Sequence, residues 1–88
     1  MPEFMKSTRK NKKYMVKVDN DWVHFGDTRY EHFFDKVPLK LYSHLNHGDK
    51  ERKKRYLARA KGIRDKQGKL TANDPKSPNY WSIRWLWT

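Results

Sequence analysis

Three of the chain's four tryptophans lie in one short segment, Tyr80 to Trp87, with the sequence YWSIRWLW. A chain of 88 residues forms at most one small core, so its stability depends on a few large side chains. The rings could instead stack on unpaired bases or anchor the chain at a membrane interface. However, the segment holds a single cation, Arg84, and places Ile83 and Leu86 among the rings. This composition favours a buried role, in which the segment fills the core.

The conformation of the same segment is predicted from the residues before it. Ser77 and Pro78 stand in the order of an N-cap and a first helical residue, which favours a helix over residues 78–86. A strand would also fit, because alternate positions are apolar. Its apolar face would carry Trp81, Ile83, Trp85 and Trp87. We expect the helix.

Residues 14–26 predict a β-hairpin. Two apolar segments, Tyr14–Val18 and Trp22–Gly26, flank Asp19-Asn20-Asp21, and Asn and Asp tolerate the positive φ that a tight turn requires. A two-residue turn brings even-numbered residues of the first strand opposite odd-numbered residues of the second. One face then carries Tyr14, Val16, Val18, Val23 and Phe25. The other face carries Lys17, Trp22 and His24.

The ordered domain is expected to begin at Tyr14. Residues 1–4 resemble a vector remnant ahead of a second initiator methionine, Met5,. Residues 5–13 form a basic arm with almost nothing to bury, which predicts disorder. Residues 14–88 are then a single α+β domain. After the hairpin we expect a short helical turn near residues 28–35, followed by irregular chain.

A central basic helix is predicted over about residues 50–61. Asp49 is placed to cap its N-terminus and Gly62 follows its end,. At about 100° per residue, Tyr56, Leu57 and Ala60 share one face with Lys53, whose charged end can reach outward. The other basic residues form two ridges. We call these the arginine ridge (Arg52, Arg55 and Arg59) and the lysine ridge (Lys50, Lys54 and Lys61).

The net charge of +11 is concentrated in two segments. Residues 5–17 carry +6 without an acidic residue, residues 50–69 carry +8, and the stretch between them is acidic overall. This excess of positive charge is larger than solubility requires and indicates a polyanionic partner. Nucleic acid is the first candidate for that partner. No helix-turn-helix, zinc-finger or aromatic sheet motif is evident that would recognise base edges.

These patterns predict non-catalytic, largely sequence-independent binding of double-stranded DNA through the central helix. Lysine and arginine neutralise phosphates and release counterions. The residues expected to contact DNA are Lys10, Lys12, Lys13, Lys50, Arg52, Lys54, Arg55, Arg59, Lys61 and Arg64.

Several other classes of protein are disfavoured by the composition. Without cysteine the chain has no disulfide, iron–sulfur cluster or thiol nucleophile. His44 and His47 have a chelating spacing but no second close pair of ligands, so we expect no metal and no cofactor. No apolar run approaches the roughly 20 residues of a spanning helix, and the basic start lacks the apolar stretch of a signal peptide. We therefore expect neither a membrane span nor secretion.

Three motifs together are similar to a known family: Trp22–Gly26 (WVHFG), His47–Arg59 (HGDKERKKRYLAR), and Ser77–Ser82 (SPNYWS) followed by Leu86-Trp87. Over residues 14–87 the chain resembles small basic proteins of unknown activity encoded by large nucleocytoplasmic DNA viruses, such as chlorella viruses and mimivirus relatives. The resemblance implies a viral origin and a location in the virion or the infected host cell. It implies no catalytic residue. Viral DNA binding of this kind would condense or package the genome.

Two alternative functions use the same basic surface. A structural virion component, such as a minor capsid or tegument protein, would turn it toward an acidic protein partner. A small metal-dependent nuclease would use His47 as a base, Asp49 as a metal ligand and Arg52 as a phosphate clamp. Two-metal hydrolysis needs more carboxylates than this cluster offers, and capping of the helix is the simpler role for Asp49.

Overall fold

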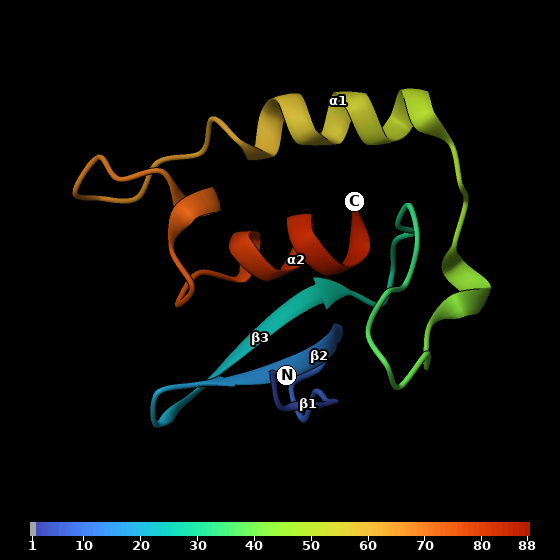
Figure 1. Ribbon diagram of the computed structural model, residues 1–88, viewed down its shortest axis with the longest axis horizontal. Coiled ribbons are helices and arrows are strands. Elements are labelled where there is room, and N and C mark those ends of the chain that lie inside the picture. The colour runs from blue at the N-terminus through green and yellow to red at the C-terminus, as the bar shows by residue number, and fades with distance from the viewer. Residues whose placement is uncertain (1) are drawn as a thin grey trace.

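The chain folds into a sheet covered by two stacked helices (Figure 1). The computed structural model describes residues 2–88. An antiparallel sheet forms one layer, α2 (Pro78–Leu86) lies directly on it, and α1 (Lys50–Ala60) crosses on the far side of α2. The strands, in their order across the sheet, are β1 (Phe4–Lys6), β2 (Lys12–Val18) and β3 (Asp21–Asp27). Two 3-10 helices, η1 (Ser43–Leu45) and η2 (Thr71–Asn73), lie in the connections. The predicted α+β class is confirmed.

The hairpin of β2 and β3 has the predicted register. Tyr14 pairs with Phe25 and Val16 pairs with Val23, so the apolar side chains of both strands share the face that α2 covers. The turn has two residues, and Asp19 adopts a φ of 56°. On the opposite face, Lys17 pairs with Trp22, as predicted.

The prediction of a disordered arm before Tyr14 is wrong. Phe4 in β1 pairs with Val16. Its ring centroid lies 6.1 Å from that of Phe25 and 4.7 Å from that of Trp85. Phe4 is one of the residues that resemble a vector remnant, yet its side chain ties this basic segment to the core. Once Phe4 is included, the segment has enough to bury and can pair as an edge strand.

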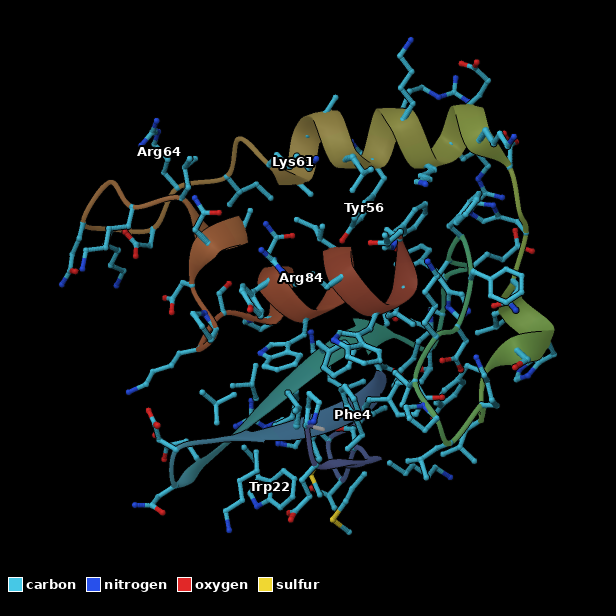
Figure 2. The ribbon with its side chains drawn as sticks, in the orientation of Figure 1. Phe4, Trp22, Tyr56, Lys61, Arg64 and Arg84 are labelled. Carbon is cyan, nitrogen blue, oxygen red and sulfur yellow. The ribbon has the colours of Figure 1, made fainter. Side chains whose placement is uncertain are left out.

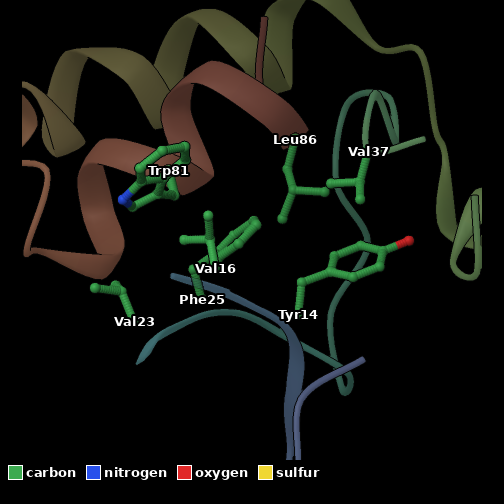
Figure 3. Close-up of a cluster of buried hydrophobic side chains, with 7 residues drawn as sticks. All are labelled: Tyr14, Val16, Val23, Phe25, Val37, Trp81 and Leu86. Carbon is green, nitrogen blue, oxygen red and sulfur yellow. The ribbon is translucent and has the colours of Figure 1, made fainter. Parts of the chain in front are cut away.

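The C-terminal aromatic segment fills the core, as predicted. Trp81 and Leu86 of α2 are buried against the apolar face of the hairpin (Figure 3). Trp85 and Trp87 are half-buried and pack around this cluster. The N-cap prediction also holds, because Ser77 Oγ accepts a hydrogen bond from the backbone N–H of Asn79. The other buried members of the cluster are Tyr14, Val16, Val23, Phe25 and Val37.

The expected helical turn near residues 28–35 does not form. The chain there is irregular and is organised by one fully buried carboxylate, that of Asp35. It accepts hydrogen bonds from Tyr14 Oη at 2.6 Å and from the backbone N–H groups of Val37 at 3.0 Å and Tyr42 at 3.1 Å. These side-chain bonds satisfy backbone groups that a helix would otherwise pair, so irregular chain can be buried.

Candidate nucleic-acid interface

The basic helix α1 begins where the sequence predicts. The Asp49 carboxylate accepts hydrogen bonds from the backbone N–H groups of Glu51 at 2.9 Å and Arg52 at 3.2 Å. These bonds, that of Arg52 first, hold the pKa of Asp49 below its usual range,. The helix ends at Ala60, and Gly62 follows the C-cap residue Lys61. A charged cap and a first-turn glutamate thus support a helix composed mostly of cations.

The inward face of α1 packs on α2 through aromatic and small side chains. Tyr56 stacks on Trp87 with ring centroids 4.0 Å apart and planes 9° apart, and Figure 2 shows Tyr56 between the two helices. Ala60 is buried against Ile83. Lys53 lies with its Nζ 4.6 Å from the ring centroid of Phe33, a cation–π contact that accounts for a lysine at the edge of a packed face. The two ridges therefore remain on the outside.

The arginine ridge lines a groove of about 1030 Å³. One wall is this side of α1, and the facing wall comes from the end of the hairpin and the segment after it. Arg55 and Arg59 have exposed side chains on the α1 wall, and Lys12 and Tyr30 lie on the other. The floor is mainly apolar and includes Tyr56, Pro78, Leu86 and Trp87.

The lysine ridge has different surroundings. Lys50, Lys54 and Lys61 are exposed, and none of them lines the groove. Lys61 lies at the C-terminal end of α1, with Arg64 beyond it in the connection to η2 (Figure 2). The sequence thus predicted the two ridges correctly, but it did not show that only one of them borders a groove.

Most cations of the two ridges take part in no ion pair with residues 2–88. Arg52 binds Glu31 with Nη1 2.9 Å from Oε1, and this hydrogen bond lowers the pKa of Glu31. Across the groove, Arg29 binds Asp27 at 2.8 Å and holds the pKa of that carboxyl well below its usual range. Within residues 2–88, no salt bridge involves Arg55, Arg59 or any member of the lysine ridge. Arg52 is the one ridge residue already engaged.

The predicted contact residues outside α1 are widely separated. Lys10 is exposed in the β1–β2 connection, whereas Lys12 is half-buried at the groove. Arg64 is exposed and donates a hydrogen bond to the carbonyl of Gly68 at 2.7 Å. Of Lys10, Lys12 and Arg64, only Lys12 lines the same groove as the arginine ridge.

Lys13 is a correction, because it cannot serve as an exposed phosphate contact. Its side chain is 2% exposed, and its Nζ donates to the carbonyl of Tyr30 at 2.9 Å and lies 2.8 Å from His32 Nδ1. Burial lowers the pKa of Lys13 to about 8,. Gly26, with a φ of 78°, permits this packing, since a Cβ there would lie 3.0 Å from both the Lys13 side chain and Leu86 Cδ1.

His32 continues this buried network. Its Nε2 lies 2.6 Å from Oδ1 of Asn46, an oxygen that can only accept, so Nε2 carries the proton and Nδ1 accepts from Lys13,. Burial and then the charge of Lys13 lower the pKa of His32 to about 4. Sequence reasoning missed this network. Its members lie up to 33 positions apart (Lys13 to Asn46) and form no local motif.

The residues considered for a nuclease make structural contacts. Asp49 caps α1, and its backbone N–H donates to His47 Nδ1 at 2.8 Å. The His47 ring packs near Trp87 and Phe33, with centroids 5.3 Å and 6.2 Å away, and burial lowers its pKa. Within residues 2–88, no group of three or more His, Cys, Asp or Glu side chains is arranged to hold a metal ion. This geometry gives no specific support to the nuclease alternative.

Comparison with known proteins adds little about activity. Residues 3–38 match a family described as "Family of unknown function (DUF5754)". The matched part contains the sheet and the buried Lys13, His32 and Asp35, while α1 lies outside it. No curated protein and no solved structure matches the chain. Among residues 2–88, neither helix has the length and apolar character needed to cross a bilayer.

Proposed function

We propose that this protein binds double-stranded DNA without catalysis and largely without regard to sequence, through the exposed cationic surface of α1. The observation that carries the proposal is that four cations of α1 and its C-cap residue Lys61 are exposed and, within residues 2–88, are engaged in no salt bridge. These are Lys50, Lys54, Arg55, Arg59 and Lys61. Such a surface favours binding of a polyanion, because each phosphate that a cation neutralises releases a counterion into solution.

The position of α1 supports this proposal. The helix forms the outer layer of the molecule (Figure 1). At about 1.5 Å per residue its 11 residues extend about 16 Å, long enough to follow several phosphates of a duplex. Between the ridges, the outer side carries Glu51 in the first turn and the short side chain of Ala58 beyond it,, so a phosphate backbone can approach closely along the C-terminal half of α1. Contacts of this kind position a protein on DNA without reading its sequence. Condensing or packaging a genome is a role that such binding would serve.

The test is a titration of duplex DNA at several salt concentrations. If six phosphates are contacted, log K should fall against log salt with a slope of about −5, and duplexes of unrelated sequence should bind alike. The double variant Lys54→Glu/Lys61→Glu should weaken binding strongly. Its matched control, Lys17→Glu/Lys36→Glu, changes the net charge equally at exposed positions outside α1 and should weaken it much less. A flat salt response, or equal losses in the two variants, would contradict the proposal.

The absence of catalysis is tested in the same experiment. Duplex and single-stranded DNA should be recovered intact after incubation with the protein in Mg²⁺ or Mn²⁺. Cleavage that is lost in Asp49→Asn would overturn this part of the proposal. Thermal unfolding of the variant is the control, because Asp49 also caps α1.

A further inference from the structure

The groove between α1 and the hairpin is not needed for duplex binding by the outer side of α1, yet it combines free arginines with exposed aromatic and apolar surface. We propose that it binds an unpaired nucleotide, with the phosphate against Arg55 and Arg59 and the base against Tyr30. This inference deepens the proposed function and rests on it. It narrows the duplex contacts mainly to the lysine ridge, and it assigns Arg55 and Arg59, two of the free cations named above, to an unpaired nucleotide in the groove.

The charges lining the groove favour a phosphate. The arginine ridge forms one wall and Lys12 lies on the other. The two carboxylates at the groove, Asp27 and Glu31, are each held by an arginine, Arg29 and Arg52 respectively. Arg55 and Arg59 therefore present guanidinium groups that no carboxylate of residues 2–88 neutralises. A planar guanidinium can donate two parallel hydrogen bonds to phosphate oxygens, which a lysine cannot.

The apolar part of the lining favours a base. Tyr30 is 64% exposed although it is a large aromatic residue, and Ile63 is 51% exposed. A base stacked on Tyr30 would remove its ring face from water, and stacking of this kind tolerates any base. The volume of about 1030 Å³ is at the upper end of the range for small-molecule sites. It therefore has room for a nucleotide together with part of its neighbours in a strand.

An intact duplex does not match this lining. The faces of its bases are covered by their stacked neighbours, so no base can lie on Tyr30 unless it leaves the helix. A single strand, a gap or an end offers both the phosphate and the free base face. The geometry therefore favours a duplex at the lysine ridge of α1 and an unpaired nucleotide in the groove beside the arginine ridge.

The experiment compares binding of a single-stranded oligonucleotide, a closed circular duplex, which has no ends, and free adenosine monophosphate. The charge variants are Arg55→Glu, which alters the groove, and Lys54→Glu, which alters the lysine ridge by the same charge at the adjacent position. The ring variants are Tyr30→Leu and Tyr30→Phe. All three residues are exposed, and thermal unfolding verifies that each variant is folded. A 2-aminopurine base in the oligonucleotide reports stacking by loss of its fluorescence.

We expect Arg55→Glu to weaken single-strand binding at least several-fold more than Lys54→Glu does. Tyr30→Leu should weaken single-strand binding by about 5- to 150-fold, the range for loss of one base–aromatic stack, and should restore 2-aminopurine fluorescence. Tyr30→Phe keeps the ring and should bind almost normally. Duplex binding should respond more to Lys54→Glu. Binding of adenosine monophosphate would show that a single nucleotide suffices; binding of the oligonucleotide alone would show that neighbouring phosphates are required.

The two proposals fail in different ways. Equal single-strand losses in Arg55→Glu and Lys54→Glu, an unaffected Tyr30→Leu variant, or no single-strand binding at all would overturn the groove assignment. Salt-dependent duplex binding would then still stand. Loss of duplex binding with groove-specific single-strand binding retained would overturn the proposed function and leave the groove site intact.

Discussion

The two most basic segments of this chain, residues 5–17 and residues 50–69, are similar in charge but differ in backbone conformation, and only the first buries a cation. The first is built into the sheet, and its Lys13 is buried with a lowered pKa. The second is mostly a helix whose cations project into solvent. Charge density alone therefore does not distinguish a segment whose cations are all at least partly exposed from one that buries a cation in a structural network. Both segments are anchored by apolar side chains, and what differs is the backbone that carries those side chains: sheet strands in the first segment and one helical face in the second,.

The difference can be traced to how each segment is anchored. In the first, Phe4 and Tyr14 flank five of the six cations along the chain. Both aromatic side chains pack in the main core, which holds β1 and the start of β2 in the sheet. In α1, the apolar side chains lie on one helical face, with Tyr56 on Trp87 and Ala60 against Ile83. Helical periodicity keeps the cations on the other faces.

The largest loss of unfolding free energy is predicted for removal of the Phe4 side chain, which anchors β1 to the core. Phe4→Ala deletes a ring that contacts Phe25 and Trp85 and should lower the free energy of unfolding by about 3 kcal/mol. Met5→Ala is the control, because Met5 is 47% exposed, and should change it by less than about 0.5 kcal/mol. Urea denaturation measures both. Similar small losses in the two variants would mean that β1 is not part of the core.

A somewhat smaller loss of unfolding free energy is expected for Lys13→Ala. The variant leaves the buried carbonyl of Tyr30 and Nδ1 of His32 without their donor. We expect a loss of about 2 kcal/mol, the typical cost of unpaired buried acceptors. Lys54→Ala removes a lysine of the same size from an exposed position and should cost less than about 0.5 kcal/mol. If the two variants lose equal amounts of unfolding free energy, the buried Lys13 contributes no more to stability than the exposed Lys54, and the contrast between the two segments is wrong.

The buried network should also make stability depend on pH. His32 has a pKa of about 4 in the fold, against 6.5 when unfolded, so between these values the unfolded state binds more protons. Stability should therefore fall by about 1–2 kcal/mol as pH drops from 6.5 to 4. Protonation of Nδ1 would place a second N–H against the Lys13 ammonium, while Nε2 remains bound to Asn46.

This pH dependence is measured by urea denaturation at pH 7 and pH 4.5. The variant His32→Asn should be less stable at pH 7 but should lose less stability on acidification. His44→Asn, at an exposed histidine, should keep the wild-type dependence. If His32→Asn also keeps it, the acid sensitivity originates elsewhere.

The sequence predicted the features that depend on local patterns. The alternation of Tyr14, Val16, Val23 and Phe25 was sufficient to set the hairpin register, because a one-residue slip would expose every apolar side chain. Asp49 and Ser77 marked the starts of both helices, because a cap uses residues two or three positions away. The two ridges of α1 follow from helical periodicity alone.

Features that depend on distant residues could not be predicted in this way. Asp35 pairs with Tyr14, and Lys13 with His32, across separations that the sequence does not mark. Phe4 could not be recognised as an anchor without knowing that Trp85 lies beside it. The groove likewise requires α1 to lie opposite Lys12 and Tyr30. In each case the tertiary arrangement, rather than local propensity, determined the outcome.

The smallest effect on stability belongs to the residue expected to matter for binding. Lys54→Ala should leave the free energy of unfolding nearly unchanged, yet it should make the slope of log K against log salt for duplex DNA less negative by about 0.9, because one phosphate contact is lost. Lys13→Ala should show the opposite pattern. Its unfolding midpoint should fall while its salt slope, measured where the variant is folded, stays that of the wild type, because a buried ammonium contacts no phosphate. If Lys13→Ala changes the slope and Lys54→Ala does not, DNA binds the sheet side of the molecule and α1 is not the interface.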